Sequence, residues 1–357
     1  MKQLKKILAV TLCMLMAFSV MSIGVGAENE AKTLKILSYN VAGLPIDIDV
    51  PLKQAAIGKY INENDYDIVA VQEDFTFHSF LADEVTNYPY QTIHSGSIPW
   101  GDGLNIFSKT KIYNESRTEW DMLSGVLDGG NDELTPKGYL YSVIELEGGV
   151  YLDFYVIHCD AYGDAGSVAA RTDNFRQLSE EILSRETDRP VIVAGDYNAF
   201  LHQHNSSKNG DCGMYEYLIQ GAGMKDGWVE CHNGGDYNNF SYYIDKYGAG
   251  YNSTCGVWDS IERVAYKNGG GVELDITKLE YDMLSGDGLD DWSDHPALDL
   301  EFTYTKTDDF VENSDPLAEK KEDKYESIFR RIYYFLVDLV KLLSNWDGLM
   351  ELLGVNK

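Results

Sequence analysis

Hydrophobic and polar positions divide the chain into short apolar runs and longer amphipathic segments. An apolar run that ends at a turn residue or a polar group is typical of a buried strand. We predict such strands at residues 34–43, 66–74, 103–112, 191–195, 260–269 and 293–304. Residues 138–160 form two apolar runs around Gly148 and Gly149, which predicts a hairpin with His158 near its far end.

Two segments have helical spacing. Apolar residues recur on one side of residues 51–64, and residues 167–186 form a second helix that Ser167 could cap. Strands therefore outnumber helices, and hairpins mix with strand–helix–strand units. This order predicts an α/β protein built as a layered sandwich with mixed β-sheets.

The two ends of the chain differ from this central region. Residues 1–27 combine three lysines, a long apolar run and a small-residue cleavage site, which favours a secretory signal peptide over a membrane anchor. We therefore expect export from the cell. Residues 28–305 form the folded domain and residues 306–324 a charged linker. Residues 325–357 are a C-terminal amphipathic helical extension that could pack on the domain, on a second copy or on a membrane surface, so the oligomeric state stays open.

The chain is strongly acidic. Its formal net charge is −29, and loss of residues 1–27 with their three lysines would take it to −32. Such a charge repels nucleic acid at long range and argues against non-specific electrostatic binding of DNA. It does not exclude a phosphate site built around a metal ion, because the ion dominates the local field.

Four cysteines follow the expected signal peptide. Outside the cell an even number suggests disulfides. Cys212, Cys231 and Cys255 lie close together in sequence, so we predict a bridge among them, whereas Cys159 lies in a strand-like run and could be a buried thiol.

Several predicted strands end in side chains that bind metals or move protons. They are Asn40, Glu73, His158, Asp196 with Asn198, and Asp294 with His295. In layered α/β folds the strand ends gather at one edge, where sites are built. The sequence therefore predicts one shared site at that edge.

These residues also carry a family resemblance. The stretches SYNV (38–41), VQED (71–74), GLNIFSK (103–109), IHCDA (157–161), GDYNAF (195–200) and SDHPAL (293–298) resemble the ordered motifs of the endonuclease/exonuclease/phosphatase superfamily. The resemblance covers residues 34–304 and implies that residues 28–305 are a catalytic domain. It implies a four-layer α/β sandwich with two mixed sheets that hydrolyses phosphate esters with a divalent cation.

The implied cation is Mg²⁺, with Mn²⁺ and Ca²⁺ as alternatives. Asn40 and Glu73 match the metal-binding positions of the superfamily, and oxygen ligands with several retained waters suit Mg²⁺. Asp294 neighbours His295 and would point to the opposite face of a strand, so we interpret it as a metal-shell or structural residue.

The remaining roles also follow from the resemblance. His295 matches the general base, since imidazole has a pKa near neutrality, and His158 matches the group that stabilises charge at phosphorus or assists the leaving group. Asp196 positions the nucleophile or a metal, and Asn198 donates to a phosphate oxygen. The family usually orients its base with an Asp, and this chain offers Glu262 in that place, with a longer arm.

Two basic side chains are candidates for contact with the substrate phosphate. They are Lys137 and Arg171, for which a solvated position is an equal alternative. The other histidines are assigned no function and are expected at the surface or in loops. They are His78, His94, His202, His204 and His232.

The sequence thus predicts a secreted, Mg²⁺-dependent phosphoester hydrolase. A phospholipid headgroup is the favoured substrate, because residues 238–258 are rich in aromatic side chains suited to an interface or a quaternary ammonium group. An extracellular deoxyribonuclease, a phosphomonoesterase and an inactive binding domain on the same fold are the alternatives.

Overall fold

The computed structural model describes residues 30–97, 100–125, 132–133, 135–185, 187–199, 213–237, 260–313 and 317–318. The predicted signal peptide, the C-terminal extension and the aromatic segment 238–258 lie outside the described residues, as do His202 and His204. None of the described helices is both long and apolar enough to cross a membrane.

The described strands form two mixed sheets of six strands each. The strands are β1 (Lys32–Asn40), β2 (Ile68–Gln72), β3 (Tyr90–Gln91), β4 (Asn105–Ser108), β5 (Ile112–Glu119), β6 (Gly138–Leu146), β7 (Val150–His158), β8 (Val191–Asp196), β9 (Lys225–Asp226), β10 (Glu262–Lys267), β11 (Val272–Asp282) and β12 (Ala297–Lys306). The first sheet has the order β11-β12-β1-β2-β4-β3, and the second has the order β5-β6-β7-β8-β10-β9. The pairs β1–β2 and β7–β8 are parallel.

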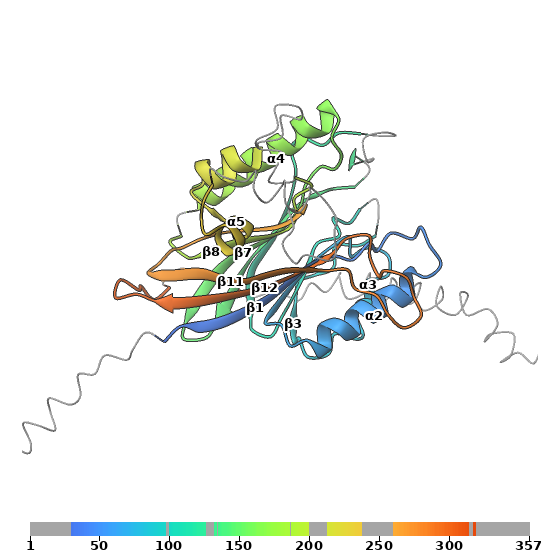
Figure 1. The fold of residues 1–357 in the computed structure, drawn as a ribbon, viewed down its shortest axis with the longest axis horizontal. Helices are drawn as coiled ribbons and strands as arrows, with labels where there is room; N and C mark the ends of the chain where they lie inside the picture. Colours follow the sequence, from blue (N-terminus) through green and yellow to red (C-terminus); the bar gives the residue numbers. More distant parts are fainter. Residues whose placement is uncertain are drawn as a thin grey trace, which may run out of the picture.

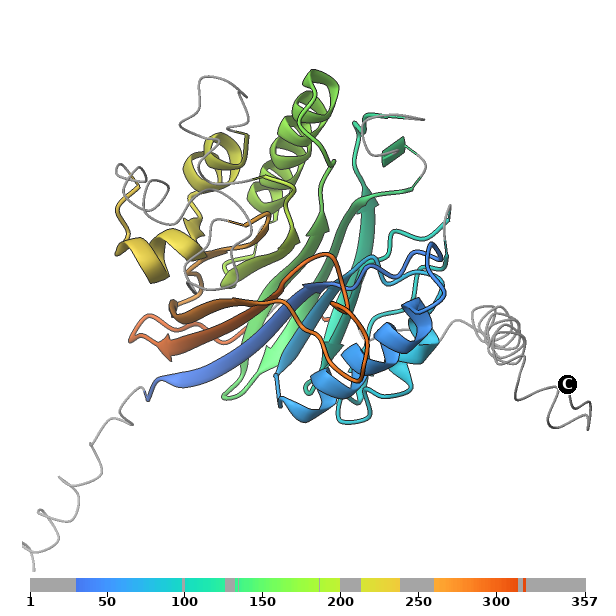
Figure 2. The ribbon, with the colours of Figure 1, turned by 45° about the vertical axis from the view of Figure 1, so that its right-hand side comes forward.

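The described helices are α2 (Val50–Glu63), α3 (His78–Ala82), α4 (Ala165–Ser184), η3 (Met214–Gly221) and α5 (Gly227–Asn233). They cover the outer faces of both sheets, except α5, which inserts Trp228 and Val229 into the core between the sheets. In Figure 1, α4 lies above the sheets and α2 and α3 lie below them, and the turned view agrees (Figure 2).

The layers follow from the two-residue period of the buried strands. In β2, Ile68 and Ala70 lie in the core between the sheets, whereas Val69 and Val71 lie in the core that contains residues of α2 and α3. Successive side chains of a strand point to opposite faces, so a strand that is apolar at every position is covered on both sides. The predicted four-layer α/β sandwich is confirmed.

Several predicted boundaries were wrong. The predicted strand 103–112 contains β4, and then the chain crosses to the second sheet as β5, whose polar sequence gave no strand signal. Helix α4 begins at Ala165 because Asp164, not Ser167, caps it by accepting hydrogen bonds from the backbone N–H groups of Gly166 (2.9 Å) and Ser167 (3.1 Å).

The beginning of the predicted linker is held against the domain. Backbone N–H groups of Thr307 and Val311 donate to Gly271 (2.8 Å) and Gly270 (3.1 Å). Residues 317–318 reach β5, where the N–H of Asn114 donates to the carbonyl of Ala318 at 3.0 Å.

The cysteine predictions met different outcomes. Cys159 is a buried free thiol, as expected for its place after β7. Cys231 is also free and half-buried, so the predicted bridge does not include it in this structure. Cys212 and Cys255 lie outside the described residues.

Candidate active site

The register of the second sheet brings three acid–base residues together. His158 is paired with Asp196 across the parallel β7–β8 ladder, and Asp196 is paired with Glu262 across β8–β10. Nε2 of His158 lies 3.5 Å from Oδ2 of Asp196. Gly195 makes this close register possible, because a Cβ there would lie 2.1 Å from the carbonyl oxygen of Ile157.

The first sheet supplies the two predicted cation ligands. Asn40 ends β1 opposite Gln72, and Glu73 follows β2 directly. Nδ2 of Asn40 lies 3.0 Å from Oε1 of Glu73 and 3.2 Å from Oδ2 of Asp196. The buried amide of Asn40 therefore joins the ends of both sheets.

His295 enters the site from the turn that precedes β12. Its Nδ1 lies 2.5 Å from Oε1 of Glu262, whose other oxygen accepts a hydrogen bond from Ser260 Oγ. Ser293 Oγ accepts from the backbone N–H of His295 at 3.2 Å and donates to the carbonyl of Asn40 at 2.7 Å. The imidazole is thus fixed from both sheets, and its Nε2 lies 3.4 Å from Nδ2 of Asn40 on the lining of the pocket.

Burial and neighbouring charges shift the titration of these groups. Burial raises the pKa of Asp196 to about 6. The negative charge of Glu262 raises this pKa further, whereas the charge of His295 lowers it. Burial alone would lower the pKa of His295, but the hydrogen bond that it donates to Glu262 and the charge of Asp196 raise it to about 10. Burial and the charge of Lys137 hold the pKa of His158 well below its ordinary range, so this imidazole is neutral.

A pocket of about 540 Å³ opens over these groups. It is lined by Leu44, Glu73, Phe75, Asp132, Thr135, Lys137, His158, Ala161, Tyr162, Asp196, Asn198, Ile261 and His295. Polar and ionisable groups lie beside an apolar wall, an arrangement typical of a site that orients a ligand with a few polar contacts.

Comparison with known proteins agrees with this geometry. The model of the Endonuclease/Exonuclease/phosphatase family matches residues 37–249. The chain belongs to this family.

Several relatives of this endonuclease/exonuclease/phosphatase chain carry the name sphingomyelinase. The sphingomyelinase of Mycobacterium tuberculosis is 30% identical over 261 residues, which cover 67% of this chain and 46% of that protein. The putative neutral sphingomyelinase of Caenorhabditis elegans is 26% identical over 306 residues, 76% of this chain and 67% of that protein. The chain spans about half the length of the mycobacterial relatives.

Solved structures share the endonuclease/exonuclease/phosphatase fold. D. rerio TDP2, humanized by 14 mutations, superposes with a TM-score of 0.55 at 16% identity, covering 76% of this chain and 98% of that chain. Beta toxin from Staphylococcus aureus gives 0.51 at 17% identity, covering 77% and 100%.

Two predicted residues lie on the pocket wall beside the central cluster. Asn198 has a positive φ of 51°, and its Nδ2 donates to the carbonyl of Cys159 at 3.0 Å, which leaves the second amide hydrogen for the pocket. Lys137 forms a buried ion pair with Asp132, and its Nζ donates to the same Cys159 carbonyl at 3.3 Å.

The structure does not bring Arg171 or Asp294 into the pocket. Arg171 is neither solvated nor a wall residue: it is 1% exposed, and its guanidinium donates to the carbonyls of Asp160 and Tyr162, both at 2.8 Å. It therefore supports the loop that carries Tyr162. Asp294 lies in the turn before β12 rather than on a strand, and its side chain is 81% exposed with Oδ1 3.9 Å from Nε2 of His295.

The histidine interpretation was wrong for His78, which is buried beside Asp74 and stacks on His94. The four-residue spacing of Asp74 and His78 is the sequence signal that could have indicated this contact. Pocket residues that the sequence did not indicate include Phe75, Asp132 and Tyr162, because only the folding of separate loops brings them to one wall.

Proposed function

We propose that this protein is an exported, Mg²⁺-dependent phosphoester hydrolase whose substrate is a phospholipid headgroup diester. One observation carries the proposal. The His295–Glu262 pair opens onto the same pocket as Glu73, Asp196 and His158, so a base, oxygen ligands and a phosphate-facing imidazole share one space.

The donor set fits a hard divalent cation. Glu73 and the buried Asp196 contribute carboxylates. Asn40 would contribute its amide oxygen Oδ1, which here accepts from the backbone N–H of Ala42 at 3.1 Å while Nδ2 donates to both carboxylates. Oxygen donors of this kind suit Mg²⁺, which also retains several waters. When bound, the cation supplies positive charge to the phosphate oxygens.

His295 is placed to act as the general base. Nδ1 donates to Glu262, which leaves Nε2 to accept the proton of the attacking water. The Glu262 carboxylate fixes this tautomer and stabilises the imidazolium that forms. The raised pKa of His295, about 10, belongs to the cation-free protein, and positive charge bound beside Glu73 and Asp196 would lower it and favour the deprotonated base.

Three side chains on the opposite wall are placed to receive the phosphate. The neutral imidazole of His158 and the amide of Asn198 donate hydrogen bonds, and Lys137 supplies a positive charge. Donors fixed before the reaction stabilise the charge that develops on phosphoryl oxygens.

A lipid substrate is supported by charge and by the surface near the pocket. A formal net charge of −29 opposes the approach of a polyanion. Ile46 and Ile48, which are 82% and 80% exposed, follow the pocket residue Leu44 on the loop before α2. Exposed aliphatic side chains beside a pocket suit an enzyme that works at a membrane surface. The proteins named sphingomyelinase among the relatives point to the same substrate class.

The proposal is tested by assaying the mature chain on matched substrates. We expect Mg²⁺-dependent release of the phosphorylated headgroup from sphingomyelin vesicles, with little nicking of supercoiled DNA and little phosphate release from inositol phosphates. His295→Ala serves as the inactive control. Robust nicking without headgroup release would favour the nuclease alternative, and no turnover on any substrate would favour a binding domain.

The membrane contact has its own test. Ile46→Asp combined with Ile48→Asp should weaken turnover on vesicles but not on a soluble chromogenic diester. Leu183→Asp, at a 56% exposed position of α4, is the matched control. Equal loss on both substrates would contradict a contact with the bilayer. Export is tested by sequencing the N-terminus of secreted protein, which should begin at Glu28.

A further inference from the structure

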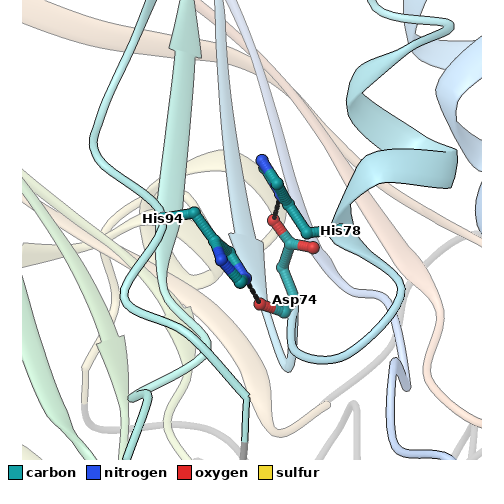
Figure 3. A group of neighbouring side chains, drawn as sticks. All are labelled: Asp74, His78 and His94. Atoms are coloured by element: carbon teal, nitrogen blue, oxygen red, sulfur yellow. Dashed lines mark hydrogen bonds and ion pairs between the residues drawn. The ribbon is translucent and has the colours of Figure 1, made fainter. Parts of the chain in front are cut away.

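A second cluster of ionisable side chains lies immediately beyond Glu73. Figure 3 shows His78 and His94 beside Asp74, with a dashed line from each imidazole to an oxygen of Asp74. Nδ1 of His78 lies 2.6 Å from Oδ2 of Asp74, which also accepts a hydrogen bond from Nδ2 of Asn105 at 2.8 Å. Nε2 of His94 lies 3.0 Å from the carbonyl oxygen of Asp74 and 3.1 Å from that of Phe75. Carbonyl oxygens only accept, so this nitrogen carries its proton.

The ring geometry disfavours a metal ion in this cluster. The two imidazoles stack with centroids 4.2 Å apart and planes inclined by 16°. A metal binds in the plane of an imidazole along its nitrogen lone pair, at about 2.0–2.1 Å for zinc. Two nearly parallel, stacked rings do not direct their lone pairs to one point. The ligand atoms of Asp74, His78 and His94 nevertheless lie within 4.8 Å of one another, and Oδ1 of Asp74 has no hydrogen-bond partner among the described residues.

The cluster instead holds the backbone of an unusual turn. Glu73 has a positive φ of 55°, a conformation that a side chain other than glycine adopts at a cost and that the surroundings must enforce. The Glu73 carbonyl accepts from the N–H of Gly43 at 3.0 Å, and the N–H of Asp74 donates to the carbonyl of Gly103 at 2.9 Å. His94 bridges the next two carbonyls, and His78 with Asn105 anchors the intervening carboxylate.

We propose that His78 and His94 are positioning residues that hold the turn at residues 73–75 so that Glu73 faces the cation and Phe75 faces the substrate. The inference rests on the proposed role of Glu73 as a cation ligand. Both side chains line the pocket, whereas Asp74 between them is turned into the cluster and fully buried. By holding Asp74, the cluster therefore fixes both of its neighbours in the pocket, Glu73 and Phe75.

The test is the Mg²⁺ affinity of His94→Phe, which keeps a stacked ring but removes the Nε2–H donor. We expect calorimetry to show Mg²⁺ binding weakened about 10-fold, as for residues that orient metal ligands. The half-saturating Mg²⁺ concentration for turnover should rise equally. At saturating Mg²⁺, kcat should stay near wild type and KM should rise, because Phe75 is released together with Glu73. His94→Gln keeps an N–H donor and should restore most of the affinity.

His232→Phe is the matched control. Its Nε2 makes the same kind of contact, with the carbonyl of Leu279 at 2.8 Å, outside the pocket lining. This variant should bind Mg²⁺ like the wild type. If His94→Phe does not fold, Asn105→Ala removes another donor to Asp74 and should weaken Mg²⁺ binding in the same direction.

Three outcomes would overturn the positioning role. The first is a lowered melting temperature of His94→Phe with unchanged Mg²⁺ affinity, which indicates a structural role only. The second is one equivalent of zinc retained by the wild type and lost from His94→Phe but not from His232→Phe, which indicates a second metal site. The third is a wild type that binds no Mg²⁺, which contradicts the proposed function as well. A wild type that binds Mg²⁺ without turnover would contradict the proposed function alone, and calorimetry would still decide the positioning role.

Discussion

Nδ1 of His295 lies 2.5 Å from Oε1 of Glu262, and this contact joins the two sheets of the sandwich. His295 precedes β12 of the first sheet, and Glu262 opens β10 of the second. The longer arm of a glutamate therefore reaches the imidazole where the family usually has an aspartate.

This pairing predicts a large loss of activity in two variants. His295→Ala removes the proton acceptor, and Glu262→Gln removes the charge that stabilises the imidazolium, so each should lower kcat by about 10²-fold or more. Glu230→Gln, at a carboxylate that binds Tyr237 away from the pocket, is the control for a lost charge. Near-normal turnover of Glu262→Gln would contradict the assigned role. The same assay on His158→Ala should also show a loss of about 10²-fold.

The oxygen donors predict dependence on a divalent cation. Glu73→Gln and Asn40→Ala should abolish Mg²⁺-supported turnover, because both remove a proposed ligand of the cation. The circular dichroism spectrum should stay intact, because Asn40 is the last residue of β1 and Glu73 follows β2. Wild-type protein stripped with a chelator should lose activity and regain it with Mg²⁺. Full activity of metal-stripped Glu73→Gln would show that the ligand assignment is wrong.

Tyr197 lies between two pocket residues in sequence but points away from them. Its ring is buried in the core beneath α4, and its hydroxyl donates to the carbonyl of Val193 at 3.0 Å. Tyr197→Phe should keep near-normal turnover and lose about 1 kcal/mol in the free energy of unfolding, since one buried hydrogen bond is removed. A larger loss of turnover than in His295→Ala would refute this assignment of faces.

Any side chain at position 195 should destabilise the fold by a steric clash. An alanine Cβ would lie 2.1 Å from the carbonyl of Ile157, and the φ of 148° disfavours any side chain. We expect Gly195→Ala to lose about 3 kcal/mol or more in urea unfolding. Gly163→Ala, where a Cβ would meet no atom within 4 Å, should change stability by no more than about 0.5 kcal/mol.

The buried carboxyl group of Asp160 should make the free energy of unfolding depend on pH. Burial raises the pKa of this carboxyl group to about 7, above its ordinary value of 3.8. The folded state then binds the proton more tightly than the unfolded state, so the contribution to stability is full at acidic pH and is lost as pH rises from about 4 to about 7. Asp160→Asn should remove this slope, and its stability relative to wild type should rise by about 2–3 kcal/mol from pH 5 to pH 8. Parallel stability profiles of the two proteins would contradict the shift.

The sequence by itself determined the strands with a clear hydrophobic period and the chemistry at their ends. The runs that became β2, β8 and the second half of β1 are buried on both faces, which is a local property of the chain, and each leads directly to Glu73, Asp196 or Asn40. The gathering of strand ends then predicted one shared site. The polar strand β5 was not predicted, because pairing with β6 rather than a local pattern defines it. Strand β11 was also missed, although buried and exposed residues alternate along Val272–Thr277 and could have indicated it.

Only the tertiary structure decided which side chains meet. The register of β7, β8 and β10 aligns His158, Asp196 and Glu262, and packing of the two sheets adds His295. The same packing buries Arg171 under a loop, where sequence could not distinguish it from a phosphate ligand. It also stacks His78 on His94, 16 positions further along the chain. These contacts depend on long-range register and burial, which a local pattern of residues does not specify.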